Sequence, residues 1–87
     1  MENISELKIV GAIIRERREQ LHLTLVDLEN LTGIKISYLS TLERGKAKNP
    51  SIKHLNTVLT KLSLSKSEVW HRVEDIQKAR SKKNDFA

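Results

Sequence analysis

The sequence contains no cysteine, which excludes disulfide bonds and thiolate metal sites. That absence is compatible with a reducing cytoplasm, the compartment we expect for this chain. The longest apolar stretch runs from Ile9 to Ile14 and is far too short to span a bilayer. The N-terminus also lacks the features of a signal peptide, so we expect no attachment to a membrane.

Aromatic residues are scarce, with one each of tryptophan, tyrosine and phenylalanine. This argues against a surface that stacks the bases of single-stranded nucleic acid, because such a surface needs several exposed rings. The histidines His22, His54 and His71 lie on different predicted elements without ligand spacing, so we expect no metal. The chain also lacks an activated nucleophile, a carboxylate pair on one predicted face and a glycine-rich phosphate loop. We therefore expect neither an enzyme nor a cofactor.

Positive charge is in excess and unevenly placed. The 87 residues carry a formal net charge of +5, and no acidic residue lies between Glu43 and Glu68. This distribution favours a polyanionic partner, either nucleic acid or an anionic membrane surface. A merely solvated cationic face is the alternative. The basic residues of the interval are Arg44, Lys46, Lys48, Lys53, Lys61 and Lys66.

Apolar residues recur at helical spacing, and no segment alternates with the period of a strand, so we predict an all-α domain. A first helix is expected over about residues 5–21. A second helix begins after Thr24, which forms a capping-box pattern with Asp27, and ends at Gly33. A third begins at about Lys35 and ends at Gly45. The apolar residues of these helices are Val10, Ile13, Ile14, Leu21, Leu25, Leu28, Leu31, Leu39 and Leu42.

Two further helices follow a polar, cationic loop over residues 46–50. Ser51 is placed to cap the fourth helix, and Ser65 with Glu68 forms a second capping-box pattern that opens the fifth. The charged tail from residue 78 to 87 is expected to fray. The chain thus forms one domain, with its core within 10–70 and a C-terminal helix and tail over 66–87. The apolar residues of these helices are Ile52, Leu55, Val58, Leu59, Leu62, Val69, Trp70, Val73 and Ile76.

Two short helices joined by a glycine turn, inside a small cationic domain, already suggest a helix-turn-helix. Residues 10–69 resemble the lambda-repressor-like (Cro-type, XRE-like) helix-turn-helix DNA-binding family almost throughout. The glycine turn alone is weak evidence, but the whole ordered set of marks is highly specific for this fold. The marks are Gly11-x-x-Ile14-Arg15-x-x-Arg18, Leu23-Thr24-x-x-x-Leu28, Thr32-Gly33-Ile34, Ser37-Tyr38-Leu39-Ser40-x-Leu42-Glu43-Arg44-Gly45, Asn49-Pro50-Ser51 and Leu55.

The resemblance implies a compact five-helix domain whose third helix enters the major groove of double-stranded DNA. It places Ile36, Ser37 and Thr41 at base-reading positions, and Tyr38 and Ser40 near the sugar-phosphate backbone or an adjacent base. The second helix, capped by Thr24, would rest its amino end on a phosphate. The residues that match the family's phosphate-binding loop are Arg44, Lys46, Lys48 and Asn49.

The chemistry of the reading positions predicts modest base readout. Serine and threonine hydroxyls read bases weakly, and Ile36 suits only an apolar contact such as a thymine methyl group. No Arg, Asn or Gln stands at the three positions, so little bidentate readout is expected. Specificity should depend on methyl contacts, on Lys35 and on DNA shape.

The sequence departs from the family pattern at several positions. Leu25 replaces a frequent phosphate-binding glutamine, and a core leucine is the favoured interpretation. Glu29 replaces a small residue between the second and third helices, and it must either reach solvent or find a cationic partner. Lys35 replaces the usual short polar N-cap of the third helix, and Ser63 replaces a common C-terminal glycine.

The family also implies a partly buried ion pair between Arg18 and Glu43, with a structural role. The expected function is that of a sequence-specific transcription regulator, in particular a repressor that binds a palindromic operator as a homodimer. An antitoxin or protein-interaction module of the same fold, with a toxin or anti-repressor as partner, is the alternative; Leu25 and Glu29 keep it open. The apolar stripe of the fifth helix is longer than one core needs. Its dimerisation residues are Val69, Trp70, Val73 and Ile76.

Overall fold

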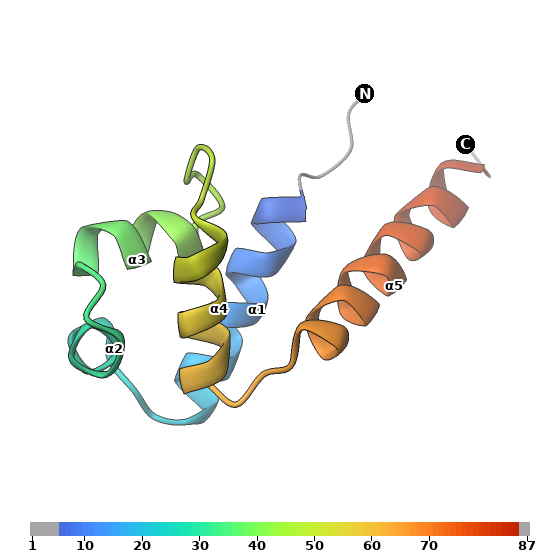
Figure 1. Cartoon of the computed structure of the whole chain (residues 1–87). Helices are drawn as coiled ribbons and strands as arrows, with labels where there is room; N and C mark the ends of the chain where they lie inside the picture. The colour runs from blue at the N-terminus through green and yellow to red at the C-terminus, as the bar shows by residue number, and fades with distance from the viewer. Residues whose placement is uncertain (1–5, 86–87) are drawn as a thin grey trace.

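The computed structural model describes residues 6–85, and the regular structure in that range is helical throughout (Figure 1). This confirms the predicted all-α fold. The predicted start of the first helix at residue 5 lies outside the described residues. The helices are α1 (Glu6–Gln20), α2 (Leu25–Thr32), α3 (Ile36–Glu43), α4 (Ile52–Lys61) and α5 (Lys66–Asp85).

One apolar core joins the helices. Helix α1 packs against α3 and α5, and α2 packs against α3 and α4. The residues that meet at the centre are almost wholly buried, as the helical spacing predicts. Within residues 6–85, no helix combines the length and the apolar character that crossing a membrane requires. The most deeply buried side chains are Ile14, Leu28, Leu39, Leu42, Val58, Leu62 and Val73.

The approach of α1 to α3 is close enough to exclude side chains at two glycines. A Cβ atom on Gly11 would lie 2.6 Å from the carbonyl oxygen of Glu43, well inside van der Waals contact. A Cβ atom on Gly45 would overlap the backbone of Lys8. The backbones of the two helices therefore touch directly, which fixes the distance of α3 from the core.

The predicted ion pair between Arg18 and Glu43 is confirmed and ties α1 to the end of α3. The guanidinium donates from Nε to Oε2 at 2.7 Å and from Nη2 to Oε1 at 3.1 Å, while Nη1 donates to the carbonyl oxygen of Leu23 at 2.7 Å. The two side chains are only 11% and 6% exposed. The hydrogen bonds to Glu43 raise the pKa of Arg18, so its guanidinium group stays charged.

The predicted caps are also present. Thr24 and Asp27 exchange backbone and side-chain hydrogen bonds at the start of α2, as Ser65 and Glu68 do before α5. The amides of Thr24 and Ser65 hold the pKa of the two carboxyl groups below their ordinary values. Ser63 has a φ of 58° after α4, in the left-handed region where the family commonly has glycine.

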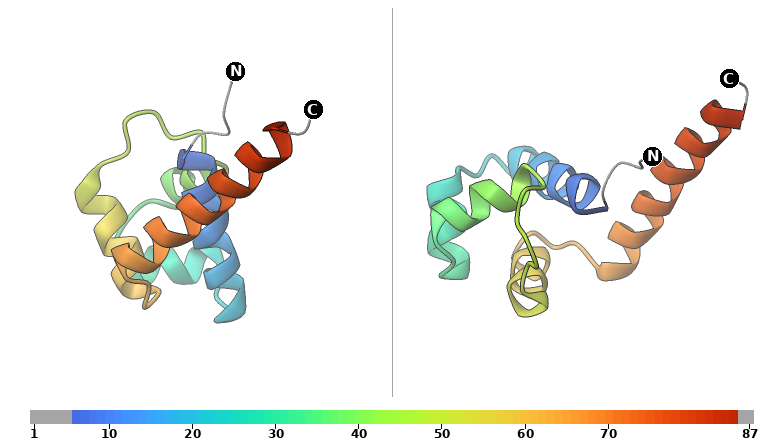
Figure 2. Two further views of the ribbon diagram at one scale, coloured as in Figure 1. Left: turned by 90° about the vertical axis from the view of Figure 1, so that its right-hand side faces the viewer. Right: turned by 90° about the horizontal axis from the view of Figure 1, so that it is seen from above.

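Helix α5 docks on α1 and then continues past the core. An ion pair between Arg72 and Glu16 at 2.8 Å joins the two helices, and Arg17 Nε donates to the carbonyl oxygen of Leu62 at 2.9 Å in the connection before α5. The C-terminal half of α5 extends away from the other helices (Figure 2), which gives the molecule its length of 46 Å. The prediction that the chain frays from Lys78 is wrong as far as Asp85, because lysine, arginine and alanine are good helix formers.

We expect Arg18→Ala to lower the free energy of unfolding by about 3 to 5 kcal/mol, because Glu43 would remain buried without its cation. Arg15→Ala is the matched control, since the ion pair of Arg15 with Glu19 has side chains 62% and 56% exposed. Its loss should cost about 0.5 kcal/mol or less. Denaturant titration of both variants measures the difference, and equal losses would contradict a structural role for the buried pair.

Candidate nucleic-acid interface

Helices α2 and α3 are joined by a short turn whose geometry follows from Gly33. This residue has a φ of 75° and donates its amide to the carbonyl oxygen of Glu29 at 2.7 Å, which ends α2 as predicted. The Thr32 hydroxyl donates to the carbonyl oxygen of Leu28 and accepts from the amide of Ile34. Ile34 is buried, so the turn is anchored in the core before α3 begins.

Helix α3 presents two distinct faces. Leu39 and Leu42 are buried in the core, as their spacing predicts. Ile36 and Ser37 are exposed, and Thr41 is half-buried at the surface. The residues predicted to read bases therefore lie on the accessible side of the helix.

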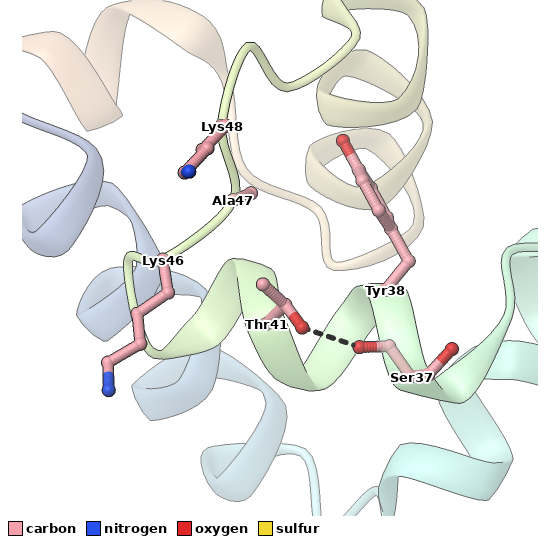
Figure 3. Close-up of a pocket in the computed structure, with 6 residues that line it drawn as sticks. All are labelled: Ser37, Tyr38, Thr41, Lys46, Ala47 and Lys48. Atoms are coloured by element: carbon pink, nitrogen blue, oxygen red, sulfur yellow. Dashed lines mark hydrogen bonds between the residues drawn. The ribbon is translucent and has the colours of Figure 1, made fainter.

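A shallow hollow of about 370 Å³ brings this face of α3 beside the cationic loop (Figure 3). In the loop, Ala47 is buried in the core, while Lys46 and Lys48 on either side of it are exposed. Burial of the central alanine thus directs both ammonium groups outward. The hollow is lined by Ser37, Tyr38, Thr41, Lys46, Ala47 and Lys48.

The structure thus brings two of the predicted base-reading residues, Ser37 and Thr41, beside two of the predicted phosphate-binding residues, which are Lys46 and Lys48. Within the hollow, the Thr41 hydroxyl donates to the carbonyl oxygen of Ser37 at 2.8 Å (Figure 3). That bond uses the only proton of the hydroxyl and leaves its lone pairs free. Thr41 can consequently accept a hydrogen bond from the amino group of adenine or cytosine, and its methyl group can contact thymine.

Tyr38 has a structural role that the sequence did not predict. Its hydroxyl accepts the amide of Ser51 at 3.2 Å, and its ring makes an edge contact with the ring of His54 at 5.2 Å between centroids. These contacts join α3 to the first turn of α4 and close the cationic loop between them. Tyr38 still lines the hollow, so the predicted DNA contact stays a prediction beside this role.

The remaining predicted DNA-binding residues are mostly exposed. Lys35 and Asn49 extend from the two ends of the interface, and Arg44 folds back so that Nε donates to the carbonyl oxygen of Ser40 at 3.3 Å. The Thr24 hydroxyl accepts the amide of Asp27 at 3.0 Å. Because that acid occupies the amino end of α2, a phosphate bound there would meet a negative charge.

Leu25 and Glu29 both have structural roles. Leu25 packs against the core, in agreement with the favoured interpretation. Glu29 is partly exposed to solvent, which agrees with one of the two expected outcomes, and its carboxylate also makes a hydrogen bond that the sequence did not predict. Its Oε2 atom accepts the backbone amide of Ile36 at 3.1 Å, whereas the N-cap residue Lys35 makes no capping bond with its side chain. The signal for this contact in the sequence is the combination of the two departures, an acceptor at Glu29 and an N-cap at Lys35 that lacks one.

The predicted dimerisation stripe divides into two parts. Val69 and Val73 are 3% and 1% exposed and pack in the core of their own chain, so the assignment of these two to an interface is corrected. Trp70 is 49% exposed, and Ile76 is partly buried against the core. Only these two remain available to a second copy.

Within residues 6–85, no three metal-ligating side chains come together.

Comparisons with known proteins agree with this geometry. The family model described as Helix-turn-helix matches residues 14–69. The clp gene regulator ClgR from Corynebacterium glutamicum is 26% identical with a TM-score of 0.82, over 98% of this chain and 89% of that chain. The restriction-modification controller protein C.Esp1396I, solved as a tetramer with its natural 35 base-pair operator, shares the fold at 23% identity. Its TM-score is 0.70, over 84% of this chain and 95% of that chain. No curated protein sequence matches the chain.

We expect Tyr38→Phe to lower the free energy of unfolding by about 0.5 to 1.5 kcal/mol, because the amide of Ser51 loses its acceptor while the ring contact with His54 is kept. Tyr38→Ala, which removes both contacts, should cost more. Denaturant titration of the two variants separates the hydroxyl from the ring. A Phe variant as stable as the wild type would show that the hydroxyl does not hold the loop.

Proposed function

Because the chain belongs to the lambda-repressor-like helix-turn-helix family, and is thus a DNA-binding transcription regulator, we propose that it represses transcription by binding a palindromic operator as a homodimer. The observation that carries this proposal is the hollow between α3 and the cationic loop. There Ser37 and Thr41 offer hydrogen-bonding groups for base edges, and Lys46 and Lys48 offer charge for phosphates. A repressor needs only to occupy its operator, so no further activity is required of the chain.

The shape of α5 supports the homodimer. The helix carries the half-exposed Trp70 and extends beyond the body of the molecule (Figure 2). An exposed aromatic ring beside a protruding helix is an arrangement that a second copy can cover. To bind a palindromic site, the homodimer needs its two copies of α3 about 34 Å apart, one turn of DNA.

We also propose that the chain is not an enzyme. The polar groups that line the hollow are hydroxyls and ammonium groups, and its lining residues include neither a carboxylate nor an imidazole that could act as a general base. The alternative of a pure interaction module depended on Leu25 and Glu29. Since the first packs in the core and the second caps α3, neither now favours that alternative.

The lysines should bind DNA without regard to sequence. We expect Lys46→Ala and Lys48→Ala to weaken binding to operator and to random DNA by similar factors. The slope of log affinity against log salt concentration should fall by about one per lost contact in each subunit. Lys61→Ala is the matched control, because this exposed lysine lies at the end of α4 far from the loop. Binding titrations at several salt concentrations measure the slopes. If the loop variants keep the full slope, the cationic loop is a solvated face and the proposal is wrong.

The hydroxyl residues of α3 should instead discriminate between sequences. We expect Ser37→Ala and Thr41→Val to weaken operator binding by about 1 kcal/mol per contact and to leave random-DNA binding unchanged, since a hydroxyl makes one hydrogen bond where an Arg makes two. Valine keeps the methyl group of Thr41 and removes the hydroxyl, and with it both the acceptor and the hydrogen bond to the carbonyl oxygen of Ser37. Titrations on the operator and on a scrambled duplex test this. Equal losses on both duplexes would mean that α3 does not face base edges.

The dimer is tested through Trp70. We expect Trp70→Glu to shift the chain toward monomer in sedimentation experiments, because it places a charge in the apolar contact. Ile52→Glu is the control, since Ile52 is 73% exposed on α4 and should not affect assembly. A wild-type chain that sediments only as a monomer at high concentration, with and without DNA, would refute the homodimer.

A further inference from the structure

The turn before α3 depends on one acidic residue of α2. The carbonyl oxygen of Glu29 accepts the amide of Gly33, and its carboxylate accepts the amide of Ile36. The same side chain thus closes the end of α2 and the beginning of α3. Within residues 33–36, the other side chain that binds a backbone amide is Thr32, whose hydroxyl accepts from Ile34. Glu29 therefore adds a direct hydrogen bond between the two helices of the motif, beside their packing in the core.

Helix α3 cannot supply this cap itself. Its N-cap residue is Lys35, in an extended conformation with φ −61° and ψ 141°. A lysine side chain has only donors, so it cannot accept an amide proton. Helix α3 spans eight residues, and a helix this short is marginal without external support. An acceptor provided by α2 compensates for the missing one.

The position of this cap is important because it lies at the end of α3 that carries two of the predicted base-reading residues. Ile36, whose amide it holds, and Ser37 are the first residues of α3 and are both exposed. A helix N-terminus ordinarily attracts phosphate, through free amides and the positive end of the helix dipole. Here a carboxylate already occupies one of those amides, so an approaching phosphate meets a negative charge.

We propose that Glu29 is a positioning residue for operator recognition, and this proposal rests on the proposed function. Its hydrogen bond fixes the first turn of α3 relative to α2, and so sets where Ile36 and Ser37 meet the bases. Its charge lowers the attraction of DNA of any sequence. The hydrogen bond therefore favours the operator selectively, while the charge weakens the binding of operator and random DNA alike.

Two substitutions separate the hydrogen bond from the charge. Glu29→Gln keeps an oxygen acceptor and removes the charge, whereas Glu29→Ala removes both. We expect both variants to bind a scrambled duplex more tightly than the wild type, and more so at low salt. We expect Gln to keep the operator-to-random affinity ratio and Ala to lower it about fivefold, the effect of one lost cap. The operator is the duplex that the wild-type protein selects from a random library.

A second substitution tests the cap by restoring it locally. Lys35→Ser places an acceptor at the N-cap of α3, where it can accept the amide of Ser37 or Tyr38. In the wild-type background this substitution removes a cation and should weaken the binding of both the operator and the scrambled duplex. In the Glu29→Ala background it should also restore the operator-to-random ratio. Restoration would show that Glu29 acts through the cap, and a ratio that stays low in the double variant would overturn the proposal.

The hydrogen bond from the Ile36 amide to Glu29 can also be measured without DNA. This measurement tests the cap independently of the proposed function. We expect the NMR resonance of the Ile36 amide proton to move upfield in Glu29→Ala and to stay near its wild-type position in Glu29→Gln. If the wild type selects no duplex, the proposed function fails, and the positioning role fails with it even where the amide resonance supports the cap. If DNA is bound but the Gln and Ala variants give the same affinity ratio, only the positioning role is overturned.

Discussion

The direct contact of α1 with α3 is the constraint on which the rest of the structure depends. Gly11 permits it, because a methyl group at that position would overlap the last carbonyl groups of α3. The ion pair of Arg18 with Glu43 then holds the C-terminal end of α3 against α1. An ion pair this buried is stable because each partner neutralises the other and because the guanidinium fork matches the carboxylate. The exposed face of α3 is determined by what this contact buries.

Helix α3 is held at each end and along one side by a different neighbour. Glu29 of α2 caps its first turn, Glu43 joins its last turn to α1, and Tyr38 joins its middle to the start of α4. The proposed base-reading groups on the free face are hydroxyls and apolar groups, whose individual contacts are expected to be weak. A rigid helix loses little conformational entropy when it binds, so restraint from three sides compensates in part for weak contacts.

A contact could be predicted from the sequence when the residues that form it lie close together along the chain. The caps at Thr24 and Ser65 were predictable because donor and acceptor lie three residues apart, and the buried ion pair was predictable through the family pattern. The bond of Tyr38 to Ser51 was not, because it spans thirteen residues and a loop whose path depends on burial of Ala47. The cap by Glu29 was missed because each departure had a plausible explanation alone. To decide which residues of the apolar stripe in α5 face the core, one must know the angle at which that helix packs. The local sequence does not encode that angle.

That angle has a consequence for the proposed assembly. Val69 and Val73 complete the core within one chain, so the fold does not depend on a partner for their burial. The side chains left for a second copy are Trp70 and part of Ile76, together with the protruding end of α5. In the proposed homodimer, a contact this limited between chains that are already folded would give a dimer population that depends on protein concentration. Binding of two copies to adjacent half-sites adds the free energy of both DNA contacts to that of the dimer. Operator occupancy should therefore rise steeply with protein concentration, even though each base contact is weak.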